Sequence, residues 1–165
     1  MSVDENPLQG AFWARVGVTI ACAGLIGLER QLRGKPAGIR TTILVCLGTM
    51  VFVRLGIDFQ DARADPTRVL GQIVTGIGFL GGGLMLNRDG SVKGVTSAAV
   101  VWIVAGIGAC IGMDQFHAAL ALTVVTLLVL VGVQQLERAF RALRRGVHAP
   151  EAPSSDPPAS GYPPS

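Results

Sequence analysis

The chain has 165 residues; 50% are hydrophobic, only 15% are charged, and the net charge is +3. Because soluble domains carry about a quarter charged residues, this single domain has too little polar surface for a water-soluble globule. The basic residues lie in short connectors without interleaved aromatic residues, which argues against a nucleic-acid partner. The composition therefore favours a protein embedded in the lipid bilayer.

Five apolar runs follow one another along the chain, each bounded by charged or turn-forming residues. They cover residues 11–28, 41–55, 69–86, 95–112 and 116–133. Their lengths approach the ~20 residues that cross a hydrocarbon core of about 30 Å. The sequence therefore predicts an all-α membrane protein, a polytopic bundle of five transmembrane helices within residues 11–133.

The segments outside the bundle differ in character. Residues 1–10 carry acidic rather than basic residues, so the first run is not expected to be a cleaved signal peptide. Residues 134–148 predict a basic cytoplasmic helix on the anionic membrane surface. Residues 149–165 are rich in Pro and Ser and are predicted to be disordered.

The connectors differ in charge on the two sides of the membrane. One side has only Arg63 and Arg68, whereas the other has ten basic residues: Arg30, Arg33, Lys35, Arg40, Arg88, Lys93, Arg138, Arg141, Arg144 and Arg145. By the positive-inside rule the N-terminus lies outside and the C-terminus lies in the cytoplasm. We expect a multi-pass protein of the bacterial inner membrane with this orientation.

Some polar and sulfur-containing side chains fall inside the apolar runs. Arg15 and Arg54 lie near the outer ends of the first two runs and are predicted to reach the membrane interface by snorkelling. Cys22, Cys46 and Cys110 lack the spacing of metal ligands and are predicted to be small core residues.

The first two pairs of runs resemble each other. Gly24-Leu-Ile-Gly27 matches Gly78-Phe-Leu-Gly81, and the stretch 35–42 resembles the stretch 93–97. This similarity indicates a parallel repeat of two helical hairpins. Chance similarity is the alternative, because glycine and threonine are common in membrane helices.

If the hairpins repeat, two helix N-termini meet at the inner membrane face. Thr41 or Thr42 and Thr96 or Ser97 are then predicted to cap them. The polar cluster at this level consists of Glu29, Arg30, Lys35, Arg40, Thr41, Thr42, Asn87, Asp89, Lys93 and Thr96. Two interpretations are open: the cluster binds an ion, favoured by the helix N-termini, or its charges bridge one another and hold the hairpins together. No cofactor is expected, and the residues do not say whether a metal binds.

The third run contains G-x-G-x-x-G at residues 76–81, the pattern of a dinucleotide-binding loop. That loop requires a preceding strand and an acidic residue about 20 positions later, and neither is present. Helical spacing explains the glycines instead, since Gly71, Thr75, Gly78 and Gly82 share one helix face.

The polar residues of this run, Gln72 and Thr75, are predicted to face the bundle interior, where they find partners. The predicted packing glycines are Gly71, Gly76, Gly78, Gly81, Gly82 and Gly83. The triplet at 81–83 either interrupts the helix beside a site or serves tight packing.

Several of these blocks occur in the order found in the MgtC/SapB family of bacterial inner-membrane proteins. The blocks are residues 24–30, 34–42, 65–68, 72–83 and 92–99 together with Trp102, with Gly82 where the family usually has alanine. The resemblance implies a polytopic helical membrane protein without an enzymatic reaction, associated with growth in low magnesium and, in pathogens, with survival in host cells. Longer members have a soluble C-terminal domain resembling ACT-type folds, so this chain resembles a short form.

Three functions follow from this reading. The first is a non-enzymatic protein of magnesium or stress homeostasis that binds other membrane proteins, and a second copy in a homo-oligomer is among the candidate partners. The alternative is a small oligomeric transporter or channel for Mg²⁺ or another ion. The third, a membrane enzyme, is disfavoured because His117 and His148 lack nearby groups suited to nucleophilic or metal chemistry.

Overall fold

The computed structural model describes residues 10–58, 67–88 and 91–147, with side chains at residues 10–58, 68–85 and 93–136. Its elements are α1 (Gly10–Leu32), α2 (Ile39–Asp58), α3 (Thr67–Leu84), β1 (Leu86–Arg88), β2 (Ser91–Lys93), α4 (Val95–Gly112) and α5 (Phe116–Val147). The predicted bundle of five helices is confirmed. The short antiparallel pair of β1 and β2, with Asn87 opposite Val92, is an addition that the apolar pattern did not indicate.

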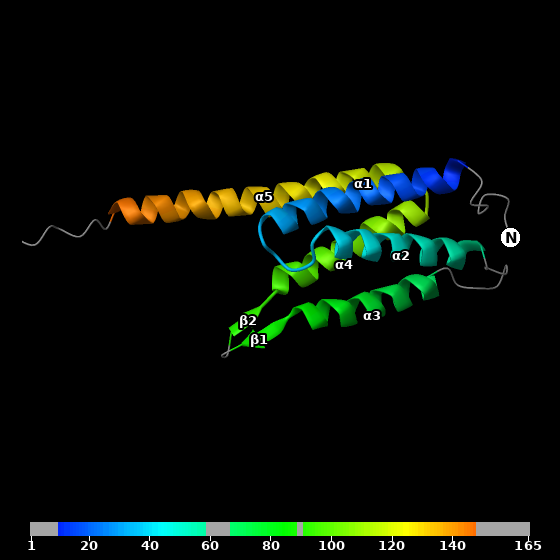
Figure 1. The fold of residues 1–165 in the computed structure, drawn as a ribbon, viewed down its shortest axis with the longest axis horizontal. Helices are drawn as coiled ribbons and strands as arrows, with labels where there is room; N and C mark the ends of the chain where they lie inside the picture. The colour runs from blue at the N-terminus through cyan, green and yellow to red at the C-terminus, as the bar shows by residue number, and fades with distance from the viewer. Residues whose placement is uncertain (1–9, 59–66, 89–90, 148–165) are drawn as a thin grey trace, which may run out of the picture.

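The helices run alongside one another in alternating directions (Figure 1). The α1–α2 connector, the β1–β2 hairpin and the C-terminal end of α5 lie at one end of the bundle, which we call the connector end. The α2–α3 and α4–α5 junctions lie at the opposite end. Residues 134–147 are not a separate helix, because α5 continues without interruption from Phe116 to Val147.

Two helices end in the same way, with a residue in the left-handed conformation. After α1, Gly34 has φ 61° and the Lys35 amide donates to the Arg30 carbonyl at 3.0 Å. After α4, Asp114 has φ 60° and the Gln115 amide donates to the Cys110 carbonyl at 2.8 Å. Both are Schellman endings, and aspartate is among the few residues that accept this conformation. The ending of α4 therefore fixes where the Asp114 carboxylate points.

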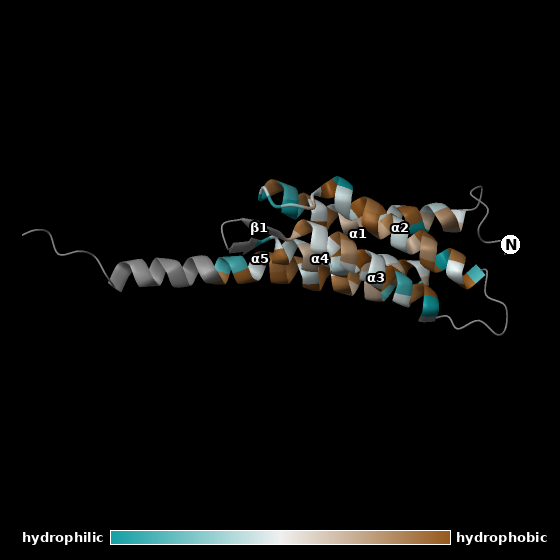
Figure 2. Cartoon of the chain, turned by 90° about the horizontal axis from the view of Figure 1, so that it is seen from below, coloured by the Kyte–Doolittle hydropathy of each residue, from teal (hydrophilic) through white to brown (hydrophobic). Residues whose placement is uncertain are grey.

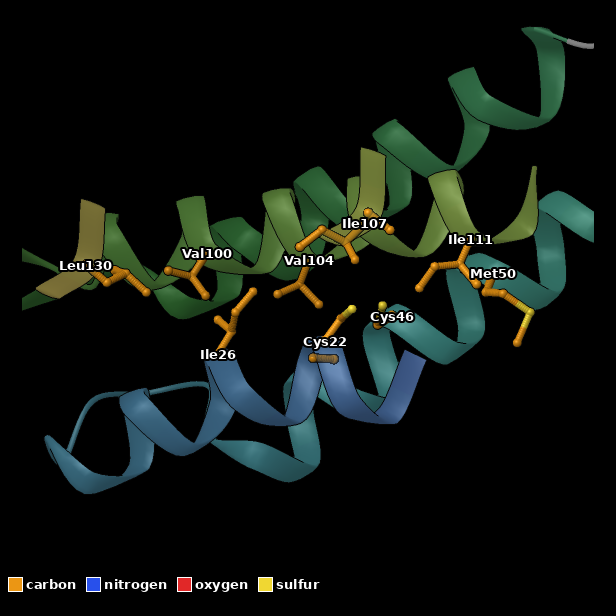
Figure 3. Packing of buried hydrophobic residues seen from close by; sticks show 11 residues of the cluster. Cys22, Ile26, Cys46, Met50, Val100, Val104, Ile107, Ile111 and Leu130 are labelled. Atoms are coloured by element: carbon orange, nitrogen blue, oxygen red, sulfur yellow. The ribbon is translucent and has the colours of Figure 1, made fainter. Parts of the chain in front are cut away.

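Helix α4 is the centre of the bundle and contacts each of the other four helices. Its sequence is apolar on all sides, as expected of a helix surrounded by others, and 56% of its residues are buried. Val100, Val104, Ile107 and Ile111 pack against α1 and α2 around Cys22 (Figure 3).

Close contact between α2 and α4 depends on two glycines. A Cβ at Gly108 would collide with the Cys46 carbonyl oxygen, and one at Gly112 would lie 2.8 Å from the Met50 carbonyl oxygen. Small residues that let backbones approach are the usual means of packing helices in lipid. Gly108 and Gly112 therefore form one packing face of α4 against α2.

The outer surface of the bundle is apolar. Figure 2 shows hydrophobic residues along the middle of the helices and hydrophilic ones toward their ends. On α5, Leu120, Val124, Val125 and Leu128 are each more than half exposed. An apolar surface of this extent is incompatible with water and suits lipid.

Four of the helices are long and apolar enough to cross a membrane: α1, α2, α4 and the Phe116–Leu136 part of α5. The apolar helix Arg68–Leu84 within α3 is shorter. At 1.5 Å per residue it is about 26 Å long, slightly less than the thickness of a hydrocarbon core. The chain is a multi-pass membrane protein with four candidate spans among the described residues, and the apolar part of α3 is shorter than any of them.

The two hairpins α1–α2 and α3–α4 have corresponding contacts, as a parallel repeat requires. Gly27 of α1 packs against Thr42 of α2, and Gly81 of α3 packs against Ala98 of α4, where a Cβ would lie 3.6 Å from the alanine Cβ. The Thr42 amide donates to the Gly38 carbonyl and the Ala98 amide to the Gly94 carbonyl. These corresponding contacts favour repetition over chance similarity.

Candidate functional site

Arg30, in the last turn of α1, is the largest fully buried side chain among the described residues, with 2% of its surface exposed. Its guanidinium donates to the Ser97 hydroxyl of α4 and to the Pro36 carbonyl of the connector, the latter at 3.3 Å. A buried charge is costly unless it is hydrogen-bonded, so these contacts hold three segments together at the connector end. For Arg30 the geometry favours the bridging interpretation over ion binding.

Glu29 lies beside Arg30, and its side chain is only 9% exposed. Its Oε1 atom is 2.7 Å from Nε of Arg33, one helical turn later. The two atoms form an ion pair but do not meet hydrogen-bond geometry, so neither carboxylate oxygen accepts a hydrogen bond from the described residues. The sequence-based cluster omitted Arg33, although its i,i+4 spacing from Glu29 could have indicated the pair.

The predicted threonine and serine caps are wrong. Helix α2 begins at Ile39, and the Thr42 hydroxyl donates to the carbonyls of Gly38 (3.3 Å) and Ile39 (3.0 Å) instead of accepting from an amide. Helix α4 has Gly94 at its N-cap, with no side-chain cap hydrogen bond. Helix α2 starts two residues earlier than the predicted run, and α4 starts at the predicted Val95, so these residues fall inside the first turn rather than at the N-cap. A hydroxyl in that position bonds back to a carbonyl, as that of Thr42 does.

Most of the predicted polar cluster does not converge. Five members are exposed, and their side chains make no ion pair or hydrogen bond with another described residue: Lys35, Arg40, Thr41, Lys93 and Thr96. Asn87 belongs to β1, but its side chain lies outside the described residues, as does Asp89 altogether. Among the described members, only Glu29, Arg30 and Thr42 have buried side chains.

The prediction that Gln72 and Thr75 face the bundle interior is wrong, because both are exposed on α3. Helix α3 turns Ile73 and Ile77 toward Val101 and Ala105 of α4 instead. The Thr75 hydroxyl donates to the Gly71 carbonyl at 3.0 Å, so it is satisfied within its own helix. Apolar burial therefore decides the rotation of α3 about its axis.

Gln72 lies in an apolar groove between α2 and α3, with a volume of about 1010 Å³. The walls are lined by Leu44, Gly48, Phe52 and Leu55 of α2 and by Arg68, Gln72, Gly76 and Leu80 of α3. The lining is completed by more buried residues: Val45, Thr49, Gly56, Val69, Ile73 and Ile77. The sequence indicated neither this groove nor its polar end, since its shape depends on how α3 packs.

Of the six predicted packing glycines, only Gly81 lies against a neighbouring helix of the same chain. At the others an added Cβ would meet no atom within 4 Å: Gly71, Gly76, Gly78, Gly82 and Gly83. Helix α3 continues through the glycine triplet to Leu84, so the triplet does not interrupt it. The face with Gly71, Thr75, Gly78 and Gly82 is open, and its role in packing against another chain stays a prediction.

The opposite end of the bundle holds an ionic network that the sequence did not indicate. Nε of Arg15 donates to Oδ1 of Asp114 at 2.8 Å, and Nη1 of Arg54 donates to Oδ2 of Asp114 at 3.1 Å. Arg54 also lies 3.8 Å from an Asp58 carboxylate oxygen. Arg15 is buried rather than snorkelling, because the α4–α5 turn brings a carboxylate to it.

The hydrogen bond from Arg15 lowers the pKa of the Asp114 carboxyl below its ordinary value. Partial burial raises that pKa, and the positive charges of Arg15 and Arg54 lower it further. Asp114 therefore remains ionised at any pH near neutrality, so the network is a permanent tie between α1, α2 and the α4–α5 turn.

The cysteines and the remaining ionisable residues offer no metal centre within the described ranges. Cys22 and Cys46 are buried in the apolar core, and all three cysteines are free thiols. No group of three His, Cys, Asp or Glu side chains converges among residues 10–58, 68–85 and 93–136.

Comparisons with known proteins agree with this architecture. The chain is 39% identical over 136 residues to the putative magnesium transporter YhiD of Escherichia coli K12, covering 78% of this chain and 62% of that protein. It is 40% identical over 149 residues to the protein MgtC of Brucella abortus, covering 84% and 61%, and 38% identical over 125 residues to MgtC of Salmonella typhimurium, covering 76% and 53%.

The chain spans about three fifths of the length of the first two relatives and about half of the third. No solved structure matches it. The model of the MgtC family matches residues 16–139, which include α2, α3 and α4 completely and most of α1 and α5. The chain therefore belongs to the MgtC family.

Proposed function

We propose that the chain is a non-enzymatic, multi-pass protein of the bacterial inner membrane that serves adaptation to magnesium limitation or stress by binding other membrane proteins. Its N-terminus lies outside and its C-terminus lies in the cytoplasm. The segments on the side of the connector end contain ten basic residues, whereas those on the opposite side contain two, and the side richer in basic residues faces the cytoplasm. The names of two relatives, a putative magnesium transporter and MgtC, support the link to magnesium.

The observation that carries this proposal is the open glycine face of α3. Gly71, Gly78 and Gly82 share one face, and each has space for a Cβ. In lipid, small residues favour association because they let another helix approach closely, yet no helix within the described part of the chain covers these three. A helix of another membrane protein, or of a second copy, fits this face.

The test is a pull-down of the full-length protein from nanodiscs prepared from magnesium-limited and magnesium-replete cells. Gly78→Leu and Gly82→Leu should remove partners that the wild type retains, because leucine fills the space that a partner backbone needs. Gly132→Leu on α5 is the matched control, since its Cβ also meets no atom within 4 Å. Recovery of the same partners by both α3 variants would overturn the proposed interface.

A transporter or channel for Mg²⁺ or another ion is the second candidate, favoured by the name of the Escherichia coli relative. The apolar core around α4 leaves the described bundle without a polar path, so an ion would have to pass between copies of the chain. Purified protein in liposomes distinguishes the candidates: Mg²⁺ flux that rises with the amount of protein would support transport, and its absence under any gradient would exclude it.

A further inference from the structure

We propose that the groove between α2 and α3 binds one anionic phospholipid, with the lipid phosphate at Arg68 and an acyl chain along the groove. Residues of α3 at four-residue spacing, from Arg68 through Gln72 and Gly76 to Leu80, form one wall. This spacing places them in a row along one helix face. At 1.5 Å per residue the row is about 18 Å long, slightly more than half of a hydrocarbon core of about 30 Å.

The width of the groove comes from two glycines at the same depth. Gly48 lies nine residues after the start of α2, and Gly76 lies eight residues before the end of α3. Because the two helices run in opposite directions, both counts start from the connector end, so the two glycines lie at nearly the same depth. A Cβ at either position would meet no atom within 4 Å. The missing side chains leave room for a methylene chain between the two helices.

The groove narrows toward Arg68, which favours a chain molecule over a protein helix. There Gly56 of α2 meets Val69 of α3 so closely that a Cβ on the glycine would lie 2.7 Å from the valine Cγ2. A helix with its side chains has a diameter of about 10 Å and does not fit between elements in contact. An extended acyl chain needs far less width.

The charges of the groove select an anionic headgroup. Arg68 is in the first turn of α3, where the apolar helix Arg68–Leu84 begins, and its side chain is exposed. Among the described residues it has no carboxylate partner, and Gln72 lies one turn deeper. A guanidinium binds phosphate oxygens through two parallel hydrogen bonds, and an amide can donate another. The remaining lining residues are apolar or small apart from Thr49, whose hydroxyl donates to the Val45 carbonyl.

Native mass spectrometry of the full-length protein in detergent tests this proposal, with added phosphatidylglycerol or phosphatidylethanolamine. We expect one phosphatidylglycerol per chain, bound about tenfold more tightly than phosphatidylethanolamine, because both lipids carry the phosphate but the ammonium of phosphatidylethanolamine offsets its charge beside Arg68. Arg68→Gln should reduce this preference to within about twofold. Gly76→Leu should remove both lipids, because its side chain occupies the middle of the groove.

Gly132→Leu on α5 is the control, since it adds the same side chain outside the groove, at a position with no atom within 4 Å of the Cβ. It should bind phosphatidylglycerol as the wild type does, and thermal melting should show that all variants are folded. Equal binding of the two lipids by the wild type, or unchanged phosphatidylglycerol binding by Arg68→Gln or Gly76→Leu, would overturn the proposal. The partner interface proposed above is independent of this result, because its glycines, Gly71, Gly78 and Gly82, do not line the groove.

Discussion

Arg15 in α1 and Asp114 in the α4–α5 turn are 99 residues apart in the chain and form a two-point ion pair, with 2.8 Å between Nε and Oδ1 and 3.2 Å between Nη2 and Oδ2. Arg54 of α2 donates to the same carboxylate. The pair joins the first helix to the last turn of the bundle, and the left-handed conformation of Asp114 sets its direction.

Asp114→Asn should lower the free energy of unfolding in detergent. Asparagine also accepts the left-handed conformation, so the substitution removes the charge and leaves the turn intact. Loss of a partner from a fully buried pair costs about 3–5 kcal/mol, and the 43% exposure of the Asp114 side chain reduces this to about 1–2 kcal/mol. Arg15→Lys should cost less, because it retains the charge but not the two-point geometry. A thermal melt of Asp114→Asn equal to that of the wild type would contradict the structural role of the pair.

The same pair predicts how stability depends on pH. Because Arg15 lowers the pKa of folded Asp114, the stabilisation is present above the pKa of the unfolded state, about 3.9. It is lost as the pH falls from that value through the lower pKa of the folded state, because over this range the unfolded state binds a proton that the ion-paired carboxylate does not. Melting temperatures of the wild type and Asp114→Asn should differ by a constant amount above about pH 5 and converge in stronger acid. A difference that stays constant down to pH 2 would be inconsistent with Asp114 as the titrating group.

Gly108→Ala should weaken the contact between α2 and α4. The added Cβ would collide with the Cys46 carbonyl oxygen, a backbone atom that cannot move without shifting the helix. Overpacking of this kind costs about 1–3 kcal/mol. Gly106→Ala on the same helix is the control, because its Cβ would meet no atom within 4 Å and alanine favours the helix by up to ~1 kcal/mol. Thermal melts should move in opposite directions for the two variants, and equal shifts would exclude close helix contact as the cause.

Arg30 and Ser97 should show energetic coupling, because the buried guanidinium donates to the serine hydroxyl. Ser97→Ala should cost about 1–3 kcal/mol and Arg30→Gln a similar amount or more. The double variant should lose less unfolding free energy than the two single variants lose together, by about 1 kcal/mol or more. A double-mutant cycle of unfolding in detergent measures this difference. Additive losses would mean that the two side chains do not interact in the protein.

The proposed orientation predicts where fused reporters are active. Alkaline phosphatase fused after Asp114 should be active, since that turn lies outside, and fusion after Arg33 should be inactive, since that connector lies in the cytoplasm. A fluorescent protein fused after residue 165 should be fluorescent. The reverse pattern in the phosphatase fusions would show that the charge bias does not set the orientation of this chain.

The sequence determined the class of the protein and the approximate helix bounds. Apolar runs as long as a bilayer is thick, separated by charged connectors, admit few other structures, because every backbone polar group in lipid must be satisfied inside a helix. The run at 95–112 became α4 with the same bounds, and the interpretation of residues 76–81 as part of a helix rather than a nucleotide loop is confirmed. These features are local, so a single segment specifies them.

Only the tertiary structure decided which side chains meet and which face of each helix is covered. Gln72 and Thr75 turn away from the core because Ile73 and Ile77 pack against α4, and polarity alone does not give that rotation. Arg15 finds Asp114 because the α4–α5 turn lies beside α1, a relationship between residues 99 positions apart. The periodicity of one helix cannot predict such contacts, because they depend on how five helices share one apolar core.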